Sequence, residues 1–199
     1  RFAIKYDIKL PIYVIRSIKK NAKKIHDISV ERVADELNKI LVLRKPSKAF
    51  ELFRITGILK ELMPELQDLV DLKQNKFHTK DAFKHTLDVV DATSDELIRR
   101  LAALFHDVGK AATRTEKNGK IQFIGHANVG AEITKLVLKR LKYPNDVIKK
   151  VSKIVLHHMD LKGAGDEAQQ IKDATLRKFI YRVSDELYDI LDVMHADNI

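Results

Sequence analysis

The stretch Leu104-Phe105-His106-Asp107-Val108-Gly109-Lys110 carries the strongest chemical signal in the sequence. It ends an apolar helical pattern that begins near Leu97, so an imidazole and a carboxylate stand together at the end of a helix. Such a donor pair suits Zn, Fe, Mn or Co. Gly109 is placed to end or distort the helix and help both side chains converge, and Lys110 can hold a phosphate beside the metal. Alone, this pair is more often a helix cap beside a surface carboxylate.

Further histidines and one carboxylate are expected at inward positions of other helices. These are His85, His126 at a helix entrance, the adjacent His157 and His158, and Asp197. Neighbours on a helix diverge by about 100°, and of the adjacent pair only His158 shares the apolar face. Asp197 follows the apolar stripe of the last helix, where an unpaired carboxylate is costly to bury and needs a metal or another cation. Each residue alone fits a core or capping role, but their spread over four helices favours one shared site.

The scarcity of glycine and proline, together with widespread helical periodicity, predicts an all-α fold. Asn118-Gly119 suits a type I′ turn, so residues 115–123 are expected to form a small β-hairpin. A polar stretch at 71–80 predicts a linker between a helical region, 1–70, and a second unit, 78–199. The expected helices of the second unit are 81–90, 95–106, 127–141, 146–158 and one helix from 174 to the end, with a loop at 162–165.

The first region is expected to hold several shorter helices. Pro11 suits the first turn of one helix, and Ser29 suits the N-cap of the next. Pro46, Gly57 and Pro64 are expected to divide the remainder into short helices.

The charge is concentrated in the first third of the chain. Of the 199 residues, 37 are Lys or Arg and 28 are Asp or Glu, and the whole net charge of +9 falls within residues 1–60. This asymmetry indicates a polyanionic partner, with a lysine-rich solvated surface as the alternative. Five cations recur every three or four residues, so they can face one side of a helix and neutralise RNA phosphates. They are Arg16, Lys19, Lys20, Lys23 and Lys24.

Several classes of protein are excluded. An apolar content of 45% excludes a wholly disordered chain, and the absence of cysteine excludes disulfides and thiolate sites. No apolar run approaches the roughly 20 residues that a membrane span needs. Nothing at the N-terminus resembles a signal peptide, so we expect a cytoplasmic protein, and the missing initiator Met indicates a fragment.

The order His85, His106-Asp107, Asp197 resembles the H…HD…D signature of HD-domain metal-dependent phosphohydrolases. The sequences FIGH at 123–126, LHHM at 156–159 and ADN at 196–198 are similar to one branch of that superfamily. This branch is the HD domain of bacterial tRNA nucleotidyltransferases, the CCA-adding enzymes and poly(A) polymerases. Residues 1–3, 31–37 and 58–66 resemble the neck and body of the same family. The Gly-rich loop and paired aspartates of its catalytic head have no counterpart here, so the chain alone is not expected to add nucleotides.

The resemblance implies an all-helical fold and one or two divalent ions, with Mg, Mn, Ni, Co, Fe and Zn not distinguished. His85, His106, Asp107 and Asp197 would bind one metal. His126 and His158, with His157 as a weaker candidate, would hold a second ion, or alternatively contact substrate or cap helices. Asp107 would also orient the attacking water, and Lys110 would bind the scissile phosphate.

The implied activities are phosphatase, 2′-nucleotidase or 2′,3′-cyclic phosphodiesterase action on a nucleotide or RNA end, with tRNA as partner. Glu31, Arg32 and Glu36 match neck positions that shape the nucleotide pocket, and their alternative role is an intrahelical ion-pair set. Two other functions stay open: an RNA-binding scaffold with a silent HD fold, and a stand-alone HD nucleotidase.

Overall fold

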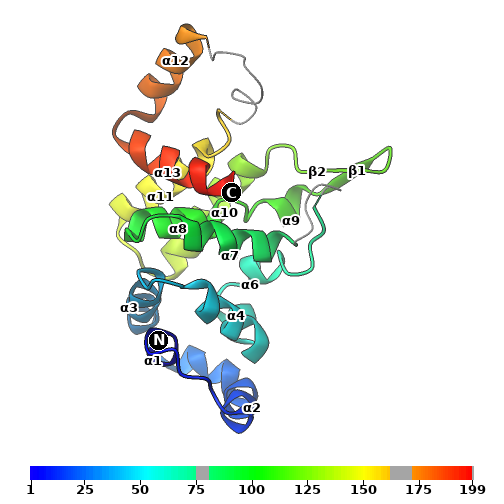
Figure 1. The fold of residues 1–199 in the computed structure, drawn as a ribbon, viewed down its shortest axis with the longest axis vertical. Helices are drawn as coiled ribbons and strands as arrows, with labels where there is room; N and C mark the ends of the chain where they lie inside the picture. The colour runs from blue at the N-terminus through cyan, green and yellow to red at the C-terminus, as the bar shows by residue number, and fades with distance from the viewer. Residues whose placement is uncertain (75–80, 162–171, 199) are drawn as a thin grey trace.

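The computed structural model describes residues 1–74, 81–161 and 172–198, and within them the chain is helical apart from one two-stranded hairpin. The all-α prediction is confirmed. Figure 1 shows an elongated molecule with the first helices at one end and α12 at the other. The N-terminal elements are α1 (Phe2–Lys5), α2 (Ile12–Asn21), the 3₁₀ helix η1 (Ala22–Asp27), α3 (Val30–Leu41), α4 (Ser47–Thr56), α5 (Ile58–Leu62) and α6 (Pro64–Gln67).

Local signals set the boundaries of these N-terminal helices. Gly57 takes a left-handed conformation with φ 80°, which a side chain would disfavour, and separates α4 from α5. Pro64 begins α6. Ser29 is the N-cap of α3 as expected, although its side chain makes no capping hydrogen bond.

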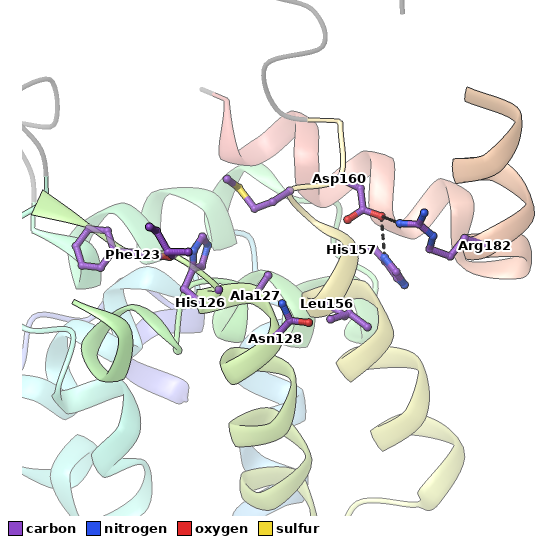
Figure 2. Close-up of a pocket in the computed structure, with 11 residues that line it drawn as sticks. Phe123, His126, Ala127, Asn128, Leu156, His157, Asp160 and Arg182 are labelled. Atoms are coloured by element: carbon purple, nitrogen blue, oxygen red, sulfur yellow. Dashed lines mark hydrogen bonds and ion pairs between the residues drawn. The ribbon is translucent and has the colours of Figure 1, made fainter. Parts of the chain in front are cut away.

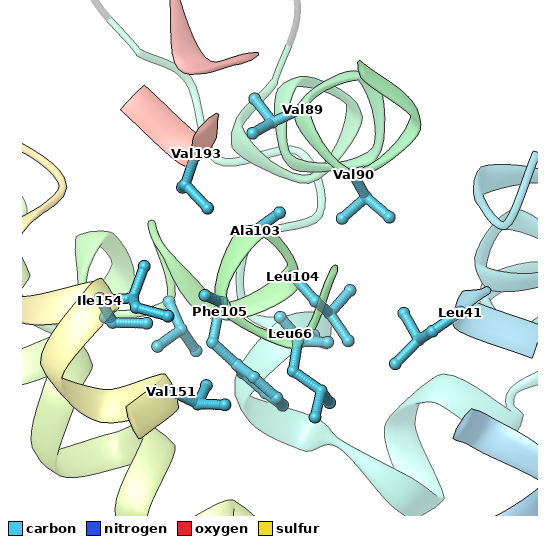
Figure 3. Packing of buried hydrophobic residues seen from close by; sticks show 14 of the residues in the cluster. Leu41, Leu66, Val89, Val90, Ala103, Leu104, Phe105, Val151, Ile154 and Val193 are labelled. Carbon is cyan, nitrogen blue, oxygen red and sulfur yellow. The ribbon is translucent and has the colours of Figure 1, made fainter. Parts of the chain in front are cut away.

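The helices that follow residue 81 form a bundle built around α8. In Figure 3, Leu104 and Phe105 of α8 lie among side chains from the surrounding helices, including Val90, Ile154 and Val193. Its elements are α7 (Ala82–Ala92), α8 (Leu97–Phe105), α9 (Lys110–Thr113), β1 (Thr115–Lys117), β2 (Lys120–Gln122), α10 (His126–Arg140), α11 (Asn145–His157), α12 (Asp173–Val183), the 3₁₀ helix η2 (Ser184–Glu186) and α13 (Leu187–Asp197).

The expected hairpin is present. Strand β1 pairs antiparallel with β2, with Lys117 opposite Lys120. Asn118 and Gly119 both have positive φ, 52° and 69°, as a type I′ turn requires.

The single C-terminal helix expected from 174 onward is wrong. The helix stops at Val183 because Ser184 adopts φ 49° and ψ −116°, which is incompatible with helix continuation. The chain then turns through η2 into α13. The break separates Arg182, which pairs with Asp160 just after α11, from Asp197 at the far end of α13.

The N-terminal helices pack directly on the bundle. Helix α3 contacts α8, and α4 contacts α7. The hydroxyl of Tyr143 donates to Asn38 Oδ1 at 2.5 Å, and Arg140 binds both oxygens of Glu65 at 2.6 and 2.8 Å. Residues 75–80 of the expected linker and the expected loop at 162–165 lie outside the described residues. Among the helices that are described, none has both the length and the apolar character to cross a membrane.

Candidate metal centre

Four side chains from three separate helical regions form a first cluster. His85 comes from α7, His106 and Asp107 follow the end of α8, and Asp197 is the last residue of α13. One potential ligand atom from each lies within 4.8 Å of the others. His85 Nε2 is 2.9 Å from Asp197 Oδ1, and His106 Nε2 is 3.2 Å from Asp107 Oδ2 and 3.4 Å from Asp197 Oδ1.

A second cluster adjoins the first and shares Asp107. Oδ1 of this carboxylate is 3.4 Å from His126 Nε2 and 3.9 Å from His158 Nε2, while Oδ2 faces His106. The two imidazole Nε2 atoms of the second cluster are 3.4 Å apart. Asp107 therefore lies between the two groups of histidines with one oxygen toward each.

Three of the histidines are oriented in the same way by the backbone. The Nδ1–H of His106, His126 and His158 each donates to the carbonyl three residues earlier, at 2.8, 2.9 and 2.6 Å respectively. This assignment of the proton to Nδ1 leaves the Nε2 lone pair free to bind a cation. The carbonyl oxygens belong to Ala103, Phe123 and Val155.

The donor atoms fit a divalent cation. His106 Nε2 is fully buried and makes no hydrogen bond within the described part of the chain, although it faces Asp107 Oδ2 and Asp197 Oδ1. Asp107 Oδ2 is paired with the ammonium of Lys110. A buried polar atom such as His106 Nε2 without a hydrogen-bond partner is rare and calls for an explanation such as a bound cation. The Nε2 lone pairs of His126 and His158 face each other, an arrangement that a cation between them would stabilise. Imidazole nitrogen with carboxylate oxygen is the donor set of divalent transition metals.

The charges of the site support the same conclusion. Burial lowers the pKa of His106, but Asp107 and Asp197 outweigh it and raise the pKa to about 10. Burial opposes ionisation of Asp107, yet the positive charges of His106 and Lys110 hold its pKa well below the usual range. Burial lowers the pKa of His126, and it lowers that of His158 to about 4, with the charge of His106 adding to the effect. The neighbouring carboxylates thus favour positive charge next to them at His106, where a bound divalent cation would take the place of the proton, while His158 stays neutral, as a ligand must.

Lys110 lies against the shared carboxylate. Its ammonium is 2.5 Å from Asp107 Oδ2 and donates to Gln74 Oε1 at 2.7 Å. It also lies 5.6 Å from the ring centre of Phe123. Gln74 is buried, and sequence reasoning missed it because it belongs to the polar stretch expected to be a linker. Its contact with Lys110 depends on the tertiary path of the chain and leaves no sequence signal.

Gly109 has a different role from the one expected. Helix α8 already ends at Phe105, and Gly109 has ordinary helical angles, φ −74° and ψ −11°. A Cβ at this position would meet the carbonyl oxygen of His126 at 2.1 Å and the amide nitrogen of Gly130 at 2.6 Å. The glycine is therefore required by the close approach of α10, which brings His126 to Asp107.

His157 is not brought into either cluster. Its Nδ1–H donates to Asp160 Oδ2 at 2.9 Å, and Arg182 binds the same oxygen at 3.0 Å. Figure 2 shows these three side chains together, apart from His126.

The five predicted RNA-contacting cations are all exposed at the N-terminal end of the molecule. Arg16, Lys19 and Lys20 belong to α2, whereas Lys23 and Lys24 fall on η1, so the expected single helix face is interrupted. A 3₁₀ helix has 3.0 residues per turn instead of 3.6, so the spacing that would align the five cations on one α-helical face does not continue past Ala22.

Two of the three neck positions on α3 form ion pairs outside their own helix. Glu31 pairs with Lys142 of the bundle at 2.8 Å, and Glu36 pairs with Arg1 at 2.9 Å as well as with Lys39 one turn along. Arg32 and Glu36 line a cavity of about 260 Å³ whose other walls are mostly apolar.

Comparison with known families now defines the class of protein. The family model described as "HD domain" matches residues 52–189, which is more than half of the chain. The chain belongs to the HD domain family. Residues 10–69 match a model described as "Probable RNA and SrmB- binding site of polymerase A".

The chain is similar over most of its length to tRNA nucleotidyltransferases, as its motifs predicted. It is 38% identical to the CC-adding tRNA nucleotidyltransferase of Thermus thermophilus, with 85% of this chain and 39% of that protein covered. It is 34% identical to the A-adding tRNA nucleotidyltransferase of Deinococcus radiodurans, with 84% and 38% covered. A multifunctional CCA protein of Methylobacillus flagellatus is 33% identical, with 84% and 42% covered. The chain thus spans about two fifths of the length of these relatives.

Proposed function

We propose that residues 78–199 form a metal-dependent phosphohydrolase unit and that residues 1–70 form an RNA-binding body of a tRNA nucleotidyltransferase. The observation that carries the hydrolase is the sharing of Asp107 between two clusters of inward-facing imidazoles. His85, His106, Asp107 and Asp197 would hold one ion, and Asp107, His126 and His158 a second. An ion bound there supplies a Lewis acid that polarises the phosphoryl group and lowers the pKa of water.

The residues of the chain account for the rest of the chemistry. Lys110 binds a phosphoryl oxygen of the substrate, and Gln74 orients Lys110. The fixed Nδ1–H bonds hold His106, His126 and His158 without reorganisation during the reaction. Water adds to phosphorus, the bond between phosphorus and the sugar oxygen breaks, and the proton lost by water ends on the leaving oxygen. The products are an alcohol and a phosphate, as in phosphatase, 2′-nucleotidase or cyclic phosphodiesterase reactions.

The hydrolase is tested by dialysing the protein separately against Mn, Ni, Co, Mg, Fe or Zn and assaying bis-p-nitrophenyl phosphate and a nucleoside 2′,3′-cyclic phosphate. We expect metal-dependent hydrolysis that His106→Ala abolishes. The matched control is His195→Ala, because His195 lies on α13 close to Asp197 in sequence but is exposed and belongs to neither cluster. If the protein binds no metal and hydrolyses neither substrate under any condition, the proposed phosphohydrolase is refuted and an RNA-binding scaffold with a silent HD fold is favoured.

The RNA-binding body rests on a separate observation. Exposed cations of α2 and η1 gather at one end of the chain, within the segment that matches the RNA-binding model. The relatives are named for tRNA, and we propose tRNA as the partner here. The cavity beside Arg32 and Glu36 is the candidate contact for a nucleotide, with Glu31 holding α3 to the bundle. Filter binding of tRNA to the wild-type protein and to the double variant Lys19→Gln, Lys20→Gln tests the proposed RNA-binding body independently of hydrolysis.

A further inference from the structure

A pocket of about 520 Å³ adjoins the metal centre, and the chemistry proposed for the two clusters does not account for it. Its wall is made by the turn that enters α10, the end of α11 and one residue of α12. His126 of the second cluster lies in this wall, so the pocket borders the metal centre. A volume of this size is within the range of pockets that enclose small ligands.

One end of the pocket lies close to a cation and to a candidate metal ligand. Phe123 lines this end, and the ammonium of Lys110 lies 5.6 Å from the centre of its ring. Because His126 also lines this end, it is the end that suits the scissile phosphate.

The far end of the pocket holds a second cation. Arg182 is fixed by a hydrogen bond from one guanidinium nitrogen to Asp160, whose same oxygen also accepts from His157. Figure 2 shows this group across the pocket from Phe123 and His126, with Asn128 and Leu156 between the two ends. A guanidinium has five N–H donors, so the bond to Asp160 orients Arg182 and leaves donors for an anion. The side chain is 57% exposed and therefore accessible from solution.

The middle of the pocket is uncharged. Leu156, Ile124 and Ala127 offer apolar surface, and the amide of Asn128 offers both a donor and an acceptor. A nucleoside has the matching chemistry, since its base combines an apolar face with hydrogen-bonding edges.

We propose that this pocket binds a nucleotide that carries a second phosphate besides the scissile one, with the nucleoside along Asn128 and Leu156 and the second phosphate on Arg182. The shared ligand chemistry has two sources: a free nucleoside bisphosphate, or the last nucleotide of an RNA, whose 5′ phosphate continues the chain. The proposal rests on the proposed phosphohydrolase for the identity of the scissile phosphate. It makes Arg182 a specificity-determining residue.

The test compares the binding of matched ligands by calorimetry in the presence of a chelator, so that no turnover is required. A nucleoside 2′-monophosphate is compared with the corresponding 2′,5′-bisphosphate, and a 2′,3′-cyclic mononucleotide with a dinucleotide that ends in the same cyclic phosphate. Since a hydrogen bond to a charged group contributes a factor of about ten or more, we expect the ligand with the second phosphate to bind at least about tenfold tighter. A larger affinity ratio for the monophosphate–bisphosphate pair identifies a free nucleotide as the ligand. A larger ratio for the mononucleotide–dinucleotide pair identifies the end of an RNA.

Arg182→Gln should remove this preference in both pairs. The matched control is Arg177→Gln, which alters an exposed arginine of the same helix that does not line the pocket and should keep the preference. An unchanged ratio in Arg182→Gln, or an equal loss in both variants, overturns the proposal. Because the readout is binding in the absence of metal, this result is independent of whether the protein hydrolyses any phosphoester.

Discussion

The substitution Gly109→Ala probes how the metal centre is assembled, because it adds one methyl group where two backbones meet. The new Cβ would lie 2.1 Å from the carbonyl oxygen of His126 and 2.6 Å from the amide nitrogen of Gly130. Neither atom is at the end of a flexible side chain. The first turn of α10 must therefore move until the Cβ–oxygen distance rises from 2.1 Å to at least 3.0 Å.

Two consequences follow from that movement. Overpacking of a tight contact costs about 1–3 kcal/mol of unfolding free energy. His126 also moves relative to Asp107, whose Oδ1 lies 3.4 Å from its Nε2, so the second cluster loses its geometry. The first cluster draws no ligand from α10 and should keep its ion.

The matched control is Gly130→Ala, on the opposite side of the same contact. Its Cβ would meet the nearest atom, the amide nitrogen of Gly109, at 3.3 Å, which is tight but tolerable with a small adjustment. Urea unfolding followed by circular dichroism measures stability, and mass spectrometry of protein dialysed against Mn counts bound ions. We expect Gly109→Ala to lose more stability than Gly130→Ala and to bind one ion where the wild type binds two. Equal urea midpoints and equal ion counts in the two variants would refute the reasoning.

Three further predictions concern the shared ligand Asp107, the packing of α6 on the bundle, and the exposed cations of α2 and η1. Asp107→Ala should remove both ions, whereas His158→Ala should leave one, as metal counting after dialysis will show; retention of two ions by Asp107→Ala contradicts a shared ligand. Burial raises the pKa of Glu65 but Arg140 outweighs it, so the pair stabilises the fold above the ordinary pKa of 4.5 and the contribution is lost as the pH falls through the lowered value. Arg140→Gln should therefore reduce the unfolding free energy by about 0.5 kcal/mol at pH 7, with the difference vanishing in acid; a difference that does not depend on pH excludes this pairing. Replacing three cations of α2 and η1 by Gln should lower the salt slope of tRNA binding by about 0.7–0.9 for each phosphate that the protein no longer neutralises, measured by fluorescence anisotropy, while Lys178→Gln at the other end serves as the control and should leave it unchanged.

Most of the fold was predictable because its signals are local. Apolar periodicity located the helices, Gly57 and Pro64 marked their ends, and Asn118-Gly119 marked the hairpin. The break at Ser184 was missed because serine has no intrinsic preference for positive φ and so leaves no signal in the sequence.

The membership of the clusters was predictable in outline. Helical geometry separates adjacent residues, so His158 could be assigned inward and His157 away from it, and the structure places them in that way. The Gln74–Lys110 bond and the role of Gly109 were not predictable, because both depend on which backbone approaches from elsewhere in the chain. The partners of Glu31 and Glu36 were missed for the same reason, since they lie 111 and 35 residues away.

The carbonyl groups that hold His106, His126 and His158 are main-chain atoms. Where a metal-binding histidine is oriented by a carboxylate, one substitution of that carboxylate releases the ring. Here no exchange of a neighbouring side chain removes the acceptor, and only a change in the backbone at the end of α8 or α11, or in the turn before α10, can do so. Substitutions of the surrounding side chains therefore leave the orientation of the three rings unchanged. The residues that line the adjacent pocket can change, and with them the substrate, without loss of the metal ligands.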